Sequence, residues 1–151
     1  MNSTATRACL GFSAGAIAAL VFHQGLAEVF DVIGIGKMVA FRLQPTWPFG
    51  IPALVSLSFW GAMYGVALAL LSPRFRRPLW QVGMAFGMVA GSVTLFVVFP
   101  LKGHPVAHGW AVWPIARTLI LTMSWGLGTG LILPLLQPRP LHRPATRAVS
   151  T

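Results

Sequence analysis

Apolar and polar positions alternate along this chain in long blocks, and four apolar blocks are each long enough to cross a lipid bilayer. A bilayer core of roughly 30 Å takes about 20 helical residues. Within lipid every backbone group must find its partner inside the protein, so each block is expected to be a helix. The pattern predicts an all-α membrane protein, a bundle of four transmembrane helices. The expected spans are Ala8–Phe30, Ile51–Ser72, Leu79–Pro100 and Trp113–Leu136.

The segments between these blocks are short and richer in proline, glycine and charge. The first, Asp31–Gly50, is still half apolar, so we expect it to lie along the membrane surface. The second, Pro73–Pro78, is a tight basic turn, and the third is Leu101–Val112. Residues 138–151 contain prolines and three arginines and should form a flexible, exposed tail. We therefore expect one transmembrane domain, residues 1–137, followed by a basic cytoplasmic tail.

The composition supports lipid as the solvent of this chain. Of its 151 residues, 56% are hydrophobic and 9% are charged, whereas roughly a quarter are charged in soluble proteins. The net charge of +9 is compatible with nucleic-acid binding. However, the basic residues form short clusters between apolar runs, not a continuous patch with interleaved aromatic residues. We therefore expect no nucleic-acid partner.

The basic residues are distributed unequally between the two sides of the predicted bundle, seven against four. Because the richer side of a membrane protein is cytoplasmic, both termini are expected inside. Arg74, Arg76 and Arg77 are expected to contact anionic lipid head groups. The richer side has Arg7, Arg74, Arg76, Arg77, Arg139, Arg143 and Arg147, and the other side has Lys37, Arg42, Lys102 and Arg117.

Every predicted span has small residues four positions apart, the GxxxG pattern that allows helices to approach closely in lipid. These stripes can pack the bundle internally, or they can face a membrane-protein partner or a second copy of the chain. The sequence leaves these alternatives open. The stripes consist of Gly11, Gly15, Gly61, Gly65, Gly83, Gly87, Gly91, Gly126 and Gly130.

The second and fourth spans resemble each other at a constant offset of 65 residues, which aligns Trp60 with Trp125 and Gly65 with Gly130. The first and third spans match more weakly. Together these matches predict two tandem helical hairpins of the same orientation, related by an axis along the membrane normal. Chance is the competing explanation, because glycine and leucine are common in membrane spans.

The polar groups of the spans gather toward the less basic side. His23 continues a stripe of small residues four apart and should point into the bundle. Glu28 can meet Gln24, one turn away, and its expected ionic partner is Arg117, with Lys102 second. Ionisable residues within a membrane are costly and often functional, although a hydrogen-bonded His23 that only orients helices is the structural alternative. A ligand or proton site is thus predicted at His23, Gln24, Glu28, Arg117 and Lys102.

Metal and cofactor chemistry has little support in the sequence. A haem held between two histidines needs facing histidines in the spans, and only His23 lies in one. His104 and His108 are weak candidates for a metal site with His23. We therefore expect no metal and no cofactor. Cys9 is the single cysteine and is expected to be a small buried apolar residue.

Four short motifs also stand out: His23-Gln24-Gly25, Pro48-Phe49-Gly50-x-Pro52, Pro100-Leu101-Lys102-Gly103 and Trp125-Gly126-Leu127-Gly128-Thr129. They lie late in the first span, before the second, after the third and within the fourth. With these motifs the chain resembles a group of small four-span bacterial inner-membrane proteins of unassigned activity. The resemblance covers most of the chain except the tail, and it implies a fold and a compartment only.

No nucleophile–base pair, phosphate-binding loop or zinc-ligand spacing is visible, so we expect a protein that is not an enzyme. The favoured function is a non-enzymatic accessory, assembly or structural subunit of the membrane. The alternative is a small transporter or a ligand- or proton-sensing protein with an outward-facing polar site. A transport path would need polar residues in the cytoplasmic half of the spans, which has few.

Overall fold

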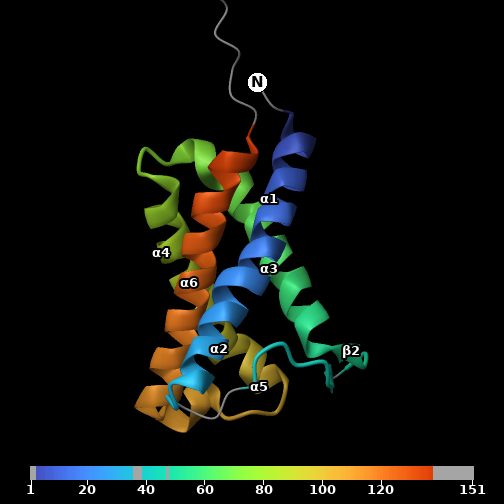
Figure 1. The fold of residues 1–151 in the computed structure, drawn as a ribbon, viewed down its shortest axis with the longest axis vertical. Coiled ribbons are helices and arrows are strands. Elements are labelled where there is room, and N and C mark those ends of the chain that lie inside the picture. The colour runs from blue at the N-terminus through green and yellow to red at the C-terminus, as the bar shows by residue number, and fades with distance from the viewer. Residues whose placement is uncertain (1–2, 36–38, 47, 138–151) are drawn as a thin grey trace, which may run out of the picture.

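The computed structural model is a bundle of four long helices (Figure 1). It describes residues 3–35, 39–46 and 48–137, so the predicted tail, 138–151, lies outside the described part. All four helices are long and apolar enough to cross a membrane, which confirms the predicted all-α bundle of a multi-pass membrane protein. They are span 1, Thr4–Val32; span 2, Ala53–Arg74; span 3, Leu79–Leu101; and span 4, Val112–Leu136.

The spans differ in how regular their helices are. Span 4 is the single helix α6 (Val112–Leu136), and span 2 is α3 (Ala53–Leu71) followed by a 3-10 turn, η2 (Ser72–Arg74). Spans 1 and 3 each contain a π-helical turn. Span 1 consists of α1 (Thr4–Ala18), η1 (Ala19–His23) and α2 (Gln24–Val32), and span 3 of α4 (Leu79–Val93), η3 (Thr94–Val98) and α5 (Phe99–Leu101).

The beginning of span 1, the end of span 4 and the connector between spans 2 and 3 lie together at one end of the bundle, here named the terminal end (Figure 1). The opposite end, the loop end, has the first connector and the third connector with its turn η4 (Val106–Trp110). The first connector contains a small antiparallel pairing of β1 (Pro45–Thr46) with β2 (Ile51–Pro52). The sequence did not predict this pairing. It is closed by a turn in which the amide of Gly50 donates to the carbonyl of Thr46.

Spans 1 and 2 pack backbone to backbone, and so do spans 3 and 4. A Cβ added at Gly65 would lie 2.8 Å from the Cα of Gly15, and one added at Gly126 would lie 3.1 Å from the Cα of Gly87. Larger residues at these crossings would force the helices apart. All nine stripe glycines face atoms of this same chain, so the stripes contribute to packing within the bundle.

The two hairpins repeat one contact pattern, but not at the offset that the sequence indicated. Gly65 lies against the carbonyl of Gly11 in the first hairpin, as Gly126 lies against the carbonyl of Gly83 in the second. This pairs Gly65 with Gly126, which are 61 residues apart, and not with the residue 65 positions on. The difference is about one helical turn.

The reason is that a close helix crossing requires a small residue and not a particular one. Ala69 faces the first stripe glycine of span 1 in the place where Gly130 faces that of span 3. The two tryptophans that the sequence aligned consequently lie in different surroundings. Trp60 is 59% exposed, whereas Trp125 is 4% exposed.

Side chains, and not backbones alone, join the two hairpins. Span 4 packs along span 1. There Nε1 of Trp125 donates to the carbonyl of Gly15 at 3.0 Å, and Oγ of Ser124 donates to the carbonyl of Phe22 at 3.1 Å. Spans 2 and 3 meet over a shorter stretch, through Tyr64, whose ring meets an aromatic ring of span 3 edge-on. The bundle is therefore asymmetric, with its main junction between spans 1 and 4.

Cys9, which the sequence predicted to be buried, is exposed on α1. That prediction was wrong, because it considered only packing between helices as the place for a small apolar side chain. In a membrane an apolar side chain can face lipid, so a small apolar residue need not be buried between helices.

Candidate functional site

A pocket of about 300 Å³ lies at the loop end, with walls from both hairpins. Among the described residues that line it, two are arginines, one is a histidine and none is acidic. Guanidinium groups donate paired hydrogen bonds to carboxylate or phosphate, so this lining favours an anion. The residues that line the pocket are His23, Gln24, Val39, Arg42, Ala53, Leu54, Leu57 and Arg117.

Two hydrogen bonds hold the backbone of Arg42 at the pocket, one made by the preceding residue and one by the carbonyl of Arg42 itself. The amide of the preceding residue, Phe41, donates to Oε1 of Gln24 at 2.7 Å. The carbonyl of Arg42 accepts from the amide of Leu54 at 2.9 Å. Leu54 lies in the first turn of α3, where amides have no partner within the helix. Spans 1 and 2 thus both fix the connector residue that supplies one of the two charges.

Phe41 has a left-handed backbone conformation, with φ 52°. This conformation costs a residue with a Cβ roughly 1–2 kcal/mol. The hydrogen bond from its amide to Gln24 offsets part of that cost. Strained residues of this kind are common at binding sites, and here the strain lies directly beside Arg42.

His23 forms the wall of the pocket on span 1. It is the last residue of the π-helical turn η1. Such a turn is bonded five residues apart instead of four, and it therefore rotates the following side chains relative to an uninterrupted α-helix. Nδ1 of His23 lies 3.5 Å from Nε2 of Gln24, at the outer limit of a hydrogen bond. This contact is weak, so a ligand in the pocket could replace it.

Arg117 lies in the second turn of α6, next to Thr118. Nε2 of His108 lies 3.2 Å from Oγ1 of Thr118, and that hydroxyl itself donates to the carbonyl of Pro114 at 3.0 Å. A hydroxyl has one proton to donate, so Thr118 accepts from His108, which donates from Nε2. This bond anchors the third connector to the helix that presents Arg117.

The residues around His108 form an unusual backbone turn. Ala107, His108, Gly109 and Trp110 all have positive φ, between 46° and 65°. This conformation persists only where the surroundings enforce it. Ala107 is fully buried, and the ring of His108 packs edge-on against Phe99 with 4.6 Å between ring centroids. Packing therefore holds the turn in place beside span 4.

The same surroundings lower the pKa of His108. Burial is the largest cause, and the positive charges of Arg117 and His104 add to it. Each of these effects disfavours the imidazolium form. His108 is therefore a neutral donor to Thr118 near neutral pH.

The structure brings three of the five predicted site residues together in the pocket, namely His23, Gln24 and Arg117. Glu28 is exposed on α2, and no ion pair joins it to Arg117 in the part of the chain that the structure describes. Lys102 is exposed after span 3 and does not line the pocket. The predicted ion pair of Glu28 with Arg117 is therefore not formed among the described residues. Arg117 instead lines a pocket whose described lining has no carboxylate.

Arg42 is the site residue that the sequence does not predict, because in the sequence it contributes only to the charge difference that orients the protein. A signal was present, since Arg42 is a basic residue within a connector that is half apolar. Gln24, expected to meet Glu28, instead accepts from the amide of Phe41. Backbone amides need a partner when water is scarce, and this need outweighs a weak side-chain pair on one helix.

Most hydroxyl groups of the spans are bonded within their own helices. Ser58, Ser92, Thr94 and Thr122 each donate to a carbonyl one turn earlier. Thr129, which is fully buried, does the same. These hydroxyls therefore add no polar path through the described interior.

The described residues contain no group of three histidine, cysteine or acidic side chains that could hold a metal ion. His104 and His108, the weak metal candidates, both pack edge-on against the ring of Phe99. Their nearest neighbours are thus an aromatic ring and, for His108, a threonine.

No protein-family model, no curated protein and no solved structure matches this chain. The function of the pocket therefore follows from its own geometry and chemistry.

Proposed function

We propose that this protein binds a small organic anion in the pocket at the loop end and does not convert it chemically. The observation that supports this most directly is the presence of Arg42 and Arg117 in one pocket that no carboxylate lines. Two guanidinium groups that line the same cavity repel each other, and an anion between them relieves the repulsion. Because each guanidinium can bond a carboxylate with two N–H groups, the anion would be held in a defined orientation.

The remaining lining residues indicate what kind of anion fits. Val39, Leu54 and Leu57 form an apolar wall, and His23 and Gln24 add polar groups without a fixed charge. The volume of about 300 Å³ is at the lower end of the roughly 300–1,000 Å³ of ligand pockets. We therefore infer a carboxylate attached to a small apolar body.

A binding role fits this pocket better than catalysis or transport. Catalysis by acid and base needs groups held in opposed protonation states near a substrate, and the pocket combines one histidine with two arginines. Transport needs a polar route onward to the terminal end. The described core in that direction consists of apolar residues, glycines and Thr129, whose hydroxyl is bonded within its own helix.

The proposal includes an orientation. We infer that the protein lies in a bacterial inner membrane with both termini in the cytoplasm, so that the pocket opens toward the periplasm. Seven arginine and lysine residues are expected on the side of the termini and four on the opposite side. This excess supports the proposed orientation.

An accessory or assembly role is the alternative proposal. The sequence favoured it because the glycine stripes could face a partner. These glycines face atoms of the same chain, which supports internal packing as the role of the GxxxG pattern. A partner would then have to dock on aliphatic and aromatic side chains such as Phe59 and Trp60, which suit lipid equally well.

Benzoate and benzamidine test the anion proposal, because they have nearly the same shape and opposite charge. Thermal unfolding of the detergent-solubilised protein is measured with each, at constant ionic strength set with chloride. A ligand that binds the folded state raises the melting temperature. We expect benzoate to raise it and benzamidine to leave it unchanged. An equal shift by both ligands would contradict an anion site.

Three matched variants then locate the site. Arg42→Gln and Arg117→Gln should each weaken benzoate binding about tenfold or more, because a hydrogen bond to a charged group contributes about 1.5–3 kcal/mol. Lys102→Gln removes the same charge at the same end of the bundle but outside the pocket, so it should leave binding unchanged. Equal losses in all three variants would indicate general charge attraction and would contradict the proposed pocket.

A further inference from the structure

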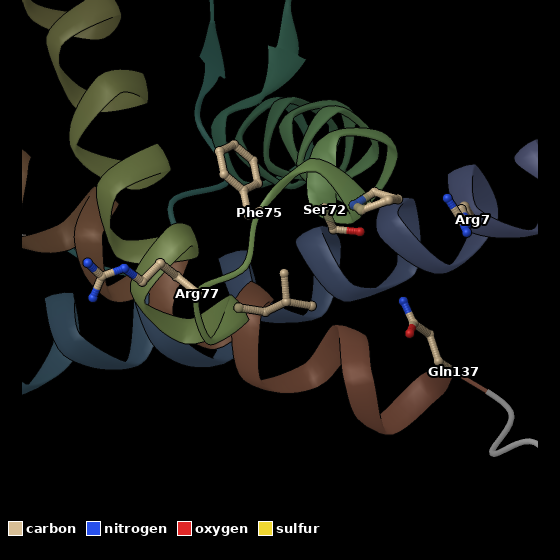
Figure 2. A pocket seen from close by; sticks show the side chains of 7 residues that line it. Arg7, Ser72, Phe75, Arg77 and Gln137 are labelled. Atoms are coloured by element: carbon tan, nitrogen blue, oxygen red, sulfur yellow. The ribbon is translucent and has the colours of Figure 1, made fainter.

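A second pocket, of about 310 Å³, lies at the terminal end (Figure 2). The beginning of span 1, the end of span 2, the connector after it and the end of span 4 all contribute to its lining. Figure 2 shows Arg7 and Arg77 on opposite sides of the pocket, with Ser72 and Gln137 between them; the amide of Gln137 is directed inward, whereas the side chain of Arg77 extends outward. Pro73, Phe75 and Leu79 complete the lining.

Arg7 and Gln137 have side-chain hydrogen-bond donors at the pocket, and the exposed side chain of Arg77 would add a third set of donors by turning inward toward a ligand. The hydroxyl of Ser72 is already used, because it donates to a carbonyl of α3 at 2.8 Å. None of the lining residues is acidic. The two acidic residues of the chain both lie in α2, at the loop end. The positive charge of this pocket therefore has no acidic partner within the chain.

The helix ends do not supply a net charge here. Helices α1 and α4 begin at the terminal end, whereas α3 and α6 end there. Their positive and negative dipole ends oppose one another, so the arginines determine the sign of the potential.

The pocket lies at the ends of the membrane spans, which is the level of lipid head groups. Its lining combines arginines with the apolar side chains of Phe75 and Leu79, as a head group with its attached chains requires. Basic pockets between transmembrane helices bind anionic head groups, and arginine pairs well with phosphate. We propose that this pocket binds a phosphate group, of the kind that an anionic phospholipid carries, between Arg7, Arg77 and Gln137.

The proposal distinguishes Arg77 from its neighbours in the sequence. Arg74, Arg76 and Arg77 are all exposed, but only Arg77 is among the residues that line the pocket. On sequence alone all three were equivalent contacts for lipid. Arg74 and Arg76 therefore serve as matched controls, with the same charge at the same end of the bundle.

Native mass spectrometry of the full chain in detergent, with added phosphatidylglycerol or phosphatidylcholine, measures which lipid is retained. We expect phosphatidylglycerol to be retained in preference. Arg7→Gln and Arg77→Gln should each weaken its retention about tenfold, while Arg74→Gln and Arg76→Gln leave it unchanged. Gln137→Leu keeps every charge and should weaken retention by a smaller factor, so the site can be tested even if an arginine variant does not fold.

Inorganic phosphate and glycerol 3-phosphate, added as competitors, separate the two sources of the phosphate group. Displacement of phosphatidylglycerol by either one assigns the phosphate group alone as the ligand. Retention despite both competitors assigns the lipid-borne phosphate together with its apolar chains. Equal losses in all four arginine variants, or equal retention of phosphatidylcholine, would overturn the proposal.

Discussion

Within each hairpin the helices meet backbone to backbone, whereas between the hairpins they meet through side chains. Gly65 and Gly126 lie so close to the opposite helix that a Cβ has no room. Between the hairpins, Trp125 and Ser124 reach across to carbonyls of span 1. Backbone contact of the first kind leaves no space for a ligand at the glycine crossings themselves.

Both candidate pockets accordingly draw their lining from both hairpins. The pocket of Arg42 and Arg117 lies at the loop end, and that of Arg7 and Arg77 at the terminal end. The comparison indicates that the close packing within each hairpin stabilises the bundle, while the ends of the junction between hairpins are available for binding. The following variants test this division.

The largest effect should follow from a side chain placed inside a hairpin. Gly126→Leu would direct a side chain against the backbone of span 3, which cannot move aside as a flexible side chain can. We expect a loss of about 3 kcal/mol or more, at the upper end of overpacking costs, measured as a fall in melting temperature and a broadened size-exclusion profile. Gly25→Leu is the matched control, because a Cβ there meets no atom within 4 Å. Equal stability of the two variants would contradict close backbone packing.

A smaller effect is expected from the junction between the hairpins. Trp125→Phe removes the donor to the carbonyl of Gly15 but keeps an aromatic ring. The expected loss is about 1 kcal/mol, the usual net contribution of one hydrogen bond, measured by chemical or thermal unfolding in detergent. Trp60→Phe is the same change at an exposed position and should have almost no effect. A larger loss for Trp60→Phe would reverse the assignment of the two tryptophans.

A substitution that changes the pocket but keeps the packing of the helices should alter ligand binding more than the stability of the protein. Gln24→Leu removes the acceptor for the amide of Phe41, and Arg42 should then lose its fixed position. We expect faster hydrogen exchange at that amide and a several-fold loss of benzoate affinity, with the melting temperature nearly unchanged. Gln44→Leu changes the same residue type in the first connector, outside the pocket, and should do neither. Unchanged exchange at Phe41 in Gln24→Leu would refute the positioning role.

The smallest expected effect is a dependence of stability on pH at the loop end. The pKa of His108 is lowered in the folded protein, mainly by burial and also by Arg117 and His104. The unfolded chain therefore binds this proton more readily, and stability should fall as the pH drops below the ordinary pKa of 6.5. Melting temperatures measured from about pH 7.5 to about pH 5 should decline slightly, and His108→Asn should decline less. An identical slope in the variant would show that His108 does not contribute.

The existence and extent of the four helices could be predicted from the sequence. The expected first span, Ala8–Phe30, lies within the observed Thr4–Val32, and the expected fourth span differs from Val112–Leu136 by one residue at its start. Transfer of an apolar block into lipid depends on that block alone, so local composition determines it. The π-helical turns and the β pairing of the first connector were not predicted, because they depend on contacts with other segments.

For the site, the sequence by itself determined which residue types lie in or beside the membrane, including His23, Gln24 and Arg117, since polar and charged groups among apolar ones are visible at once. Only the tertiary structure decided that Arg42 joins them and that Glu28 does not. Those outcomes depend on which helices cross, at which register, and on how a π-helical turn rotates the side chains that follow it. Contacts such as that between Trp125 and Gly15, 110 residues apart, exist only after the hairpins have packed. Hydrophobicity is a property of each segment, whereas a pocket is a property of several segments together.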